Sequence, residues 1–157
     1  MEEVKEMDRA ERQIVVFNLA GEAYGVDITA VQEIIHLRKI THVPRMPPEV
    51  NGVINLRGKI VPVVDLRRRL SLPCRPLGEE SRIIVVRADD CTLGLIVDGV
   101  HEVLRIDLSL IEPISAFVVN VDTDYLTGVV NSEERLIVLI DLDLIFPSGR
   151  QSGKAAI

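Results

Sequence analysis

Residues 52–66 read Gly-Val-Ile-Asn-Leu-Arg-Gly-Lys-Ile-Val-Pro-Val-Val-Asp-Leu, which is two apolar runs joined at Arg57-Gly58. Short runs rich in Val and Ile on both sides of a glycine-containing turn are typical of a β-hairpin. The second half of the chain repeats the pattern, because residues 128–142 read Gly-Val-Val-Asn-Ser-Glu-Glu-Arg-Leu-Ile-Val-Leu-Ile-Asp-Leu. Glycine, asparagine and aspartate fall at matching places. The stretch therefore indicates a β-unit that is present twice.

Two more blocks extend the duplication. Residues 14–26 align with residues 83–95, which places Gly25 on Gly94, and Val31-Gln-Glu-Ile aligns with Val100-His-Glu-Val. Four blocks in the same order give a unit of about 70 to 75 residues, and self-similarity at such a period marks repeated structural units. We expect two subdomains, over residues 12–74 and 80–147, with an N-terminal strand that the two can share, and flexible ends at 1–11 and 148–157.

Each copy contains short Val- and Ile-rich stretches separated by turns at fairly even spacing, which is typical of a small barrel or sandwich. After Asp27, apolar residues at 28, 31, 34 and 35 predict a capped helix in the first copy, whereas residues 97–104 alternate like a strand. Asp65 and Asp141 each follow an apolar run and predict the N-cap of a short helix. We expect residues 71–80 to form the link between the copies, and residues 111–124 to form an irregular segment. We expect an all-β protein with a few short helices.

Composition argues against several classes of protein. The net charge of −6 and an aromatic content of 3% disfavour nucleic acid as a partner, because such binding relies on clustered cations and on base stacking. The longest apolar runs, Ile60–Val64 and Leu136–Ile140, are far shorter than the roughly 20 residues that span a bilayer. Cys74, Cys91 and the histidines lack metal-ligand spacing. We therefore expect neither a metal nor a cofactor. The charged N-terminus lacks the apolar segment of a secretory signal, so we expect a cytoplasmic protein.

The two equivalent aspartates suggest an enzymatic alternative, because aspartic proteases take one catalytic carboxylate from each half. Small residues would have to follow each aspartate, but Leu-Arg follows Asp65 and Leu-Asp follows Asp141. Helix capping explains both carboxylates without catalysis. The chain also contains no motif for a phosphate cradle, a nucleophile elbow or a zinc protease.

Two groups of basic residues stand out on this acidic chain. Arg67-Arg68-Arg69 can form a solvated helix face whose aliphatic stems cover the core, or a patch that orients an acidic partner. A tight turn does not require arginine, so turn propensity does not explain Arg57. Its guanidinium could pair with Glu33, Glu49 or an acid of a partner.

The same blocks resemble a known family. Residues 52–67 resemble the signature block of CheW-like domains, and residues 24–34, residues 95–104 and Tyr125-Leu-Thr-Gly accompany it in the expected order. The match extends over residues 12–146. The resemblance implies two SH3-like five-stranded β-barrels in tandem and a non-catalytic scaffold of bacterial chemotaxis signal transduction. Because no receiver or kinase segment is present, we expect a stand-alone coupling protein.

The resemblance also implies partners. In this family the coupling protein bridges the cytoplasmic helical hairpin of chemoreceptors and the regulatory domain of the histidine kinase CheA. The chain would thus associate with membrane-bound receptor arrays through its partners, without inserting into the membrane itself. Two alternatives stay open, namely a hydrolase that uses Asp65 and Asp141 at the groove between the barrels, and a CheW-like adaptor of a different sensory pathway.

Site residues follow from the matching motifs. A receptor groove between the barrels suits an amphipathic helix, and the residues implied to line it are Val31, Glu33, Val100 and Val103. The same valines would serve equally well as core at the contact between the barrels. Arg57, Gly58 and Lys59 would form a hairpin that faces a partner, either the kinase or the receptor.

Overall fold

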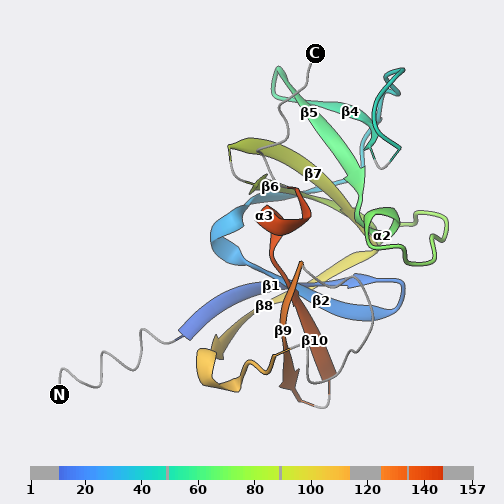
Figure 1. The fold of residues 1–157 in the computed structure, drawn as a ribbon. Coiled ribbons are helices and arrows are strands. Elements are labelled where there is room, and N and C mark those ends of the chain that lie inside the picture. Colours follow the sequence, from blue (N-terminus) through green and yellow to red (C-terminus); the bar gives the residue numbers. More distant parts are fainter. Residues whose placement is uncertain (1–10, 49, 89, 114–124, 134, 147–157) are drawn as a thin grey trace.

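The computed structural model describes residues 11–48, 50–88, 90–113, 125–133 and 135–146, which form two five-stranded sheets and four short helical turns (Figure 1). The all-β fold predicted from the sequence is confirmed. The predicted flexible ends, residues 1–10 and 148–157, and most of the predicted irregular segment lie outside the described residues, whereas Glu11, which the prediction included in the first end, begins a strand. The strands are β1 (Glu11–Leu19), β2 (Glu22–Asp27), β3 (Val31–His36), β4 (Val50–Leu56), β5 (Lys59–Asp65), β6 (Arg82–Ala88), β7 (Cys91–Val97), β8 (Gly99–Asp107), β9 (Leu126–Ser132) and β10 (Arg135–Ile140).

The two sheets exchange hairpins. Sheet A has the strand order β8-β1-β2-β10-β9, and sheet B has the order β3-β6-β7-β5-β4. The first hairpin of each sequence copy, β1–β2 or β6–β7, therefore completes the sheet that contains the last three strands of the other copy. Parallel pairing of β2 with β10 and of β7 with β5 makes the joins. The sheets thus divide the chain differently from the predicted subdomains, whose boundary lies near residues 74–80.

The chain passes from one sheet to the other at the links that follow β2 and β7. The hairpin turns at Ala20-Gly21 and Arg57-Gly58 reverse the chain with two consecutive positive φ angles, as a tight two-residue hairpin requires. The links after β2 and β7 are residues 28–30 and the single residue Asp98, and none of these has a positive φ. The chain therefore continues into the neighbouring sheet.

Isolated bridges close each sheet toward a barrel. Thr41, beyond β3, pairs with Val53 of β4, and Glu112, beyond β8, pairs with Val129 of β9. In sheet B, the chain that follows β3 thereby reaches the opposite edge strand, β4. In sheet A, the chain that follows β8 reaches the opposite edge strand, β9.

The helical turns are η1 (Ile28–Ala30), α2 (Leu66–Arg69), η2 (Leu108–Leu110) and α3 (Leu142–Ile145). Asp27 caps η1 as predicted, but the predicted helix over residues 27–35 is wrong because it ends after one turn and residues 31–36 form β3. β-Branched residues at 31, 34 and 35 suit a strand, and β3 pairs with β6 along its length. The expected difference between the copies is therefore wrong as well, because residues 99–107 also form a strand. Among the described residues, no helix is long and apolar enough to cross a membrane.

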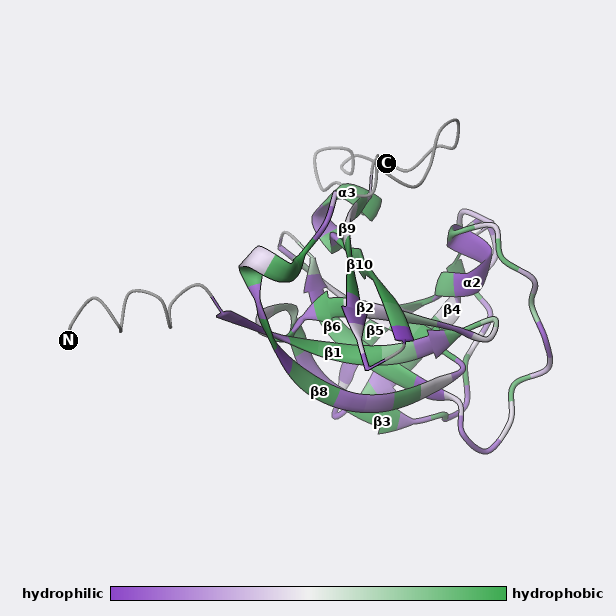
Figure 2. Cartoon of the chain, turned by 90° about the horizontal axis from the view of Figure 1, so that it is seen from below, coloured by the Kyte–Doolittle hydropathy of each residue, from purple (hydrophilic) through white to green (hydrophobic). Residues whose placement is uncertain are grey.

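The core consists of three clusters of buried apolar residues: one shared by the two sheets, one inside sheet A and one inside sheet B. β1 lies between the shared cluster and that of sheet A, and β6 lies between the shared cluster and that of sheet B. Alternate β1 residues Val15, Phe17 and Leu19 face a cluster shared by both sheets, while Ile14 and Val16 face the interior of sheet A. In β6, residues 84, 86 and 88 face the shared cluster, and residues 83 and 85 face the interior of sheet B. Strands covered on both faces require continuous apolar runs, and these strands show as green bands through the centre of the molecule in Figure 2.

The glycines that align in the two copies lie where the backbone approaches its neighbours closely. A Cβ on Gly52 would overlap the carbonyl oxygen of Thr41, and one on Gly128 would lie 2.5 Å from Ile111 Cγ2. Both glycines adjoin the bridges that close the barrels. Their recurrence in the sequence is therefore explained by closure of each barrel.

Replacing Gly52 by alanine should destabilise the fold by about 3 kcal/mol, because the added Cβ meets backbone and the φ of +152° is one that side chains rarely adopt. Denaturant unfolding measures this loss. Gly78 is the matched control, since a Cβ added there would have nothing within 4 Å and Gly78→Ala should cost no stability. Equal stability of the two variants would contradict the closure role of Gly52.

Separate expression of residues 1–75 and 76–157 should give two unfolded fragments, because each fragment lacks a hairpin of its sheet. Thermal unfolding followed by circular dichroism should show no cooperative transition for either fragment. The full chain is the control. A cooperative transition in one isolated fragment would show that a sequence copy folds without the exchange.

Candidate partner-binding surfaces

The four predicted groove residues lie on two edge strands. Within the described parts of the chain, β3 pairs with β6 alone and β8 with β1 alone. Val31 and Val100 are half-buried and pack against the shared core, which joins them to one apolar cluster. Val103 is 48% exposed, and the Glu33 side chain is 29% exposed. We call β3 and β8 with these four residues the seam, and the two strands run along the same margin of the molecule in Figure 2.

Arg57 sits at the tip of the β4–β5 hairpin and pairs with the seam. Its φ is +51° and that of Gly58 is +87°, and the Gly58 amide donates to Asn55 Oδ1 at 2.8 Å. The Arg57 guanidinium donates to both carboxylate oxygens of Glu33, with Nη1 at 3.3 Å from Oε1. Of the acids predicted for Arg57, Glu33 binds it, and Glu49 lies outside the described residues. Lys59 is exposed beside this pair.

The hydrogen bond from Arg57 is the main reason that the pKa of Glu33 lies below the usual range of a glutamate. The same hydrogen bond raises the pKa of Arg57. Both groups are therefore charged at neutral pH. The Arg57 side chain keeps 70% exposure while paired, so it can also meet a partner.

A second ion pair of the same kind was missed by the sequence reasoning. Arg135, at the start of β10, donates to Glu102 of β8. Glu102 aligns with Glu33 in the duplicated block, so the alignment of Val31-Gln-Glu-Ile with Val100-His-Glu-Val contained the signal. Each barrel thus ties its edge strand to the tip of a hairpin through one glutamate and one arginine.

Exposed apolar side chains repeat as well. Ile34 is 40% exposed on β3, and its counterpart in the duplicated block is Val103 on β8. Ile60 at the start of β5 and Leu136 at the start of β10 are 67% and 56% exposed. Apolar residues next to charged ones on an exposed edge are typical of surfaces that bind other proteins.

The three consecutive arginines of α2 have three different surroundings. Arg67 is buried and binds Asp65 and Asp98. Arg69 donates to the Ile145 carbonyl oxygen of α3 at 3.0 Å and lies over the ring of Tyr125. Only Arg68 is exposed. The three arginines therefore form neither a continuous solvated face nor a basic patch.

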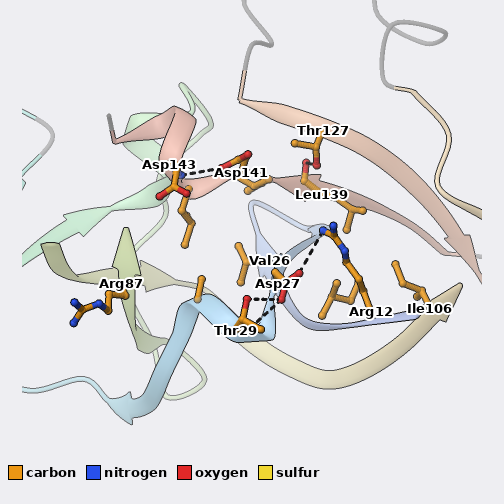
Figure 3. A pocket seen from close by; sticks show the side chains of 14 residues that line it. Arg12, Val26, Asp27, Thr29, Arg87, Ile106, Thr127, Leu139, Asp141 and Asp143 are labelled. Atoms are coloured by element: carbon orange, nitrogen blue, oxygen red, sulfur yellow. Dashed lines mark hydrogen bonds and ion pairs between the residues drawn. The ribbon is translucent and has the colours of Figure 1, made fainter. Parts of the chain in front are cut away.

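Both candidate catalytic aspartates are helix caps. Asp65 accepts from the Arg67 amide and Asp141 accepts from the Asp143 amide, as predicted for N-caps. Asp141 lines a cavity of about 450 Å³ at one end of sheet A (Figure 3). Asp27 in the same cavity accepts from Thr29 and from Arg12. In the described part of the chain, no group of histidines, cysteines and carboxylates is arranged to hold a metal.

Comparison with known proteins gives a consistent result. The family model of the CheW-like domain matches residues 13–150. The chain is 36% identical to the chemotaxis protein CheW of Klebsiella aerogenes over 87% of its own length and 82% of that protein. It is also 36% identical to the chemotaxis protein CheW of Bacillus subtilis over 92% of both chains. Among solved structures, it is similar to the scaffolding protein TtCheW from Thermoanaerobacter tengcongensis, with a TM-score of 0.80, 42% identity and coverage of 91% and 95% of the two chains.

Replacing Arg57 by glutamine should raise the pKa of Glu33, because the hydrogen bond that lowers it is lost. A lowered pKa means that the ion pair stabilises the fold above the usual glutamate range and is lost as the pH falls through the lowered value. The Glu33 carboxylate should therefore protonate at higher pH in the variant, which carboxyl ¹³C NMR titration measures. Arg135→Gln is the matched control and should leave Glu33 unchanged. Identical Glu33 titrations in the wild type and Arg57→Gln would contradict the pairing.

Proposed function

The chain belongs to the CheW-like domain family, and on that premise we propose that it holds chemoreceptor signalling tips and the histidine kinase CheA together. Members of this family are non-catalytic scaffolds, and the chain is a coupling adaptor of chemotaxis signalling rather than an enzyme. The proposal puts it in the cytoplasm, associated with membrane-bound receptor arrays through its partners. A hydrolase based on Asp65 and Asp141 is not favoured, because both carboxylates cap helices.

The seam is the proposed receptor site. The observation that carries this assignment is that Val31 and Val100, near the starts of two edge strands, are half-buried on one core cluster. Apolar side chains flanked by charged ones match a helix that presents an apolar stripe with polar margins. Glu33 lies at the margin of this surface and is fixed there by Arg57.

The Arg57 hairpin is the proposed second partner-facing surface. Arg57, Gly58 and Lys59 are all exposed. The guanidinium keeps free donors while it binds Glu33, because arginine carries five N–H groups. A carboxylate of the kinase or the receptor can therefore bind Arg57 without breaking the internal pair. Ile60 beside it supplies exposed apolar area for the same contact.

Edge strands also offer backbone groups. Outside the seam, β4 and β9 are the other end strands of the two described sheets, and each carries one isolated bridge. Unpaired edges attract other strands. Pairing with a similarly folded regulatory domain of the kinase would satisfy these groups, which supports a partner whose fold is also built from small β-barrels.

Isothermal titration calorimetry with a receptor cytoplasmic hairpin fragment and with the CheA regulatory domain tests the proposal. Both should bind the wild-type chain. Val103→Glu should weaken the receptor contact at least tenfold, because a charge replaces an exposed apolar side chain at the proposed contact. Leu144→Glu is the matched control, since Leu144 is similarly exposed on α3 and away from the seam. No binding of either partner by the wild type would refute the adaptor function.

Arg57→Glu should weaken one of the two contacts while leaving the thermal unfolding midpoint nearly unchanged, because exposed ion pairs contribute little to stability. Calorimetry with each partner, together with a thermal melt, measures both effects. Arg68→Glu reverses an exposed charge away from the hairpin and serves as the control. A large fall in the midpoint would show that Arg57 is structural instead.

A further inference from the structure

Asp98 lies where the chain passes from one sheet to the other, and its hydrogen bonds hold the chain there. It is the single residue between β7 of sheet B and β8 of sheet A. Its amide donates to the Asn18 carbonyl oxygen at 3.0 Å, and its Oδ2 accepts from the Ala20 amide at 2.8 Å. Its Oδ1 accepts from Arg67 Nη1 at 3.0 Å. One carboxylate thus binds a donor in the β1–β2 turn of sheet A and a donor in α2, which directly follows β5 of sheet B.

Arg67 holds that carboxylate from inside the protein. Its side chain is 3% exposed. Nε and Nη2 donate to the two oxygens of Asp65 at 3.0 and 2.9 Å, and Nη1 also donates to the Arg75 carbonyl oxygen at 2.7 Å. The hydrogen bond with Asp65 raises the pKa of Arg67, so the group is charged although it is buried. A buried guanidinium with this many partners has one geometry.

The other crossing between the sheets is held differently. It runs from Asp27 through η1 to β3, and its ion pair, Arg12 with Asp27, spans 3.4 Å with side chains 55% and 34% exposed. Where the first copy has Asp65-Leu-Arg67, the second has Asp141-Leu-Asp143. Arg67, which binds Asp98 at the crossing from β7 to β8, therefore corresponds to Asp143, which lies near the crossing from β2 to β3.

We propose that Arg67 and Asp98 are positioning residues of the seam. β8, one wall of the seam, begins at Gly99 directly after Asp98, and Val100 follows at the second position of the strand. The opposite wall, β3, belongs to sheet B, to which Arg67 is joined through Asp65 of β5. Asp98 and Arg67 therefore fix the start of β8 relative to the sheet that carries β3. The inference rests on the proposed receptor-binding function of the seam.

The spacing of the walls matters because a binding surface must hold its groups close to the productive geometry. Neither Arg67 nor Asp98 needs to touch the partner for this. Loss of either should change how well the seam fits a helix while both sheets remain folded. The expected effect is on affinity and on the distance between β3 and β8.

Asp98→Asn is the direct test. An amide offers one acceptor atom, whereas the two oxygens of Asp98 face two donors, Arg67 and Ala20, so one bond must be lost. Asp141→Asn is the matched control, because Asp141 caps α3 as Asp65 caps α2, but its carboxylate accepts from the Asp143 amide, away from Arg67 and Asp98, and asparagine still caps a helix. Arg67→Lys is a second variant that keeps the charge but cannot serve all four acceptors, and it replaces Asp98→Asn if that variant does not fold.

Two measurements report on each variant. Spin labels at His36→Cys and His101→Cys, both exposed, report the distance between β3 and β8 in a background that carries Cys74→Ser and Cys91→Ser. Calorimetry reports affinity for the receptor hairpin fragment. Asp98→Asn and Arg67→Lys should shift or broaden the distance distribution and weaken binding about tenfold. Asp141→Asn should leave both the distance and the affinity unchanged.

An unchanged distance in Asp98→Asn would overturn the inference, as would an effect no larger than that of Asp141→Asn. Failure of the wild-type chain to bind the receptor fragment would contradict the proposed function instead. In that case the label distances would still decide whether Asp98 and Arg67 set the spacing of β3 and β8.

Discussion

The shared apolar cluster between the sheets is the constraint on which the rest of the structure depends. β1 and β6 place alternate residues into it, Phe17 and Ile84 among them, and use the intervening residues to fill their own sheets. A strand that serves two cores must be apolar on both faces, and it must lie centrally. The hairpins that contain these strands are the ones that the two sequence copies exchange. Neither barrel therefore has a complete set of strands from one copy, and the fold is a single cooperative unit.

Placing β1 and β6 at the centre leaves β3 and β8 at the edges, and the surfaces proposed for binding follow from that placement. Each edge strand carries a glutamate that pairs with an arginine from a neighbouring hairpin, Glu33 with Arg57 and Glu102 with Arg135. The shapes of the two surfaces are related by the duplication, but their charges differ. The turn residue with positive φ is Arg57 in one hairpin and Glu133 in the other. Two related surfaces of different charge suit an adaptor that has to bind unlike partners, because charge discriminates between partners of similar shape.

The duplication, the all-β class, the hairpin turns and the aspartate caps could be predicted because each depends on residues close together in the sequence. The exchange of hairpins could not, since aligned blocks in the same order do not reveal which copy a hairpin pairs with. Apolar residues at 28, 31, 34 and 35 have the spacing of a helix face, yet pairing with β6 made residues 31–36 a strand. The partner of Arg57 was among the acids considered. The burial of Arg67 was missed because its second partner, Asp98, is distant in the sequence.

The two Asp-Leu motifs show how one local structure can serve two purposes. Asp65 and Asp141 both cap a single helical turn at the end of a parallel-paired strand. The residue two positions later sets the surroundings of each turn. Arg67 turns inward and joins the sheets through Asp98, whereas Asp143 is exposed beside an open cavity (Figure 3). A like charge at position 143 cannot form an ion pair with Asp27 or Asp141, which line the same cavity. The two repeat units thus share one local design, and the arginine of one and the aspartate of the other leave a buried guanidinium bound to two carboxylates at one crossing and a more exposed ion pair at the other.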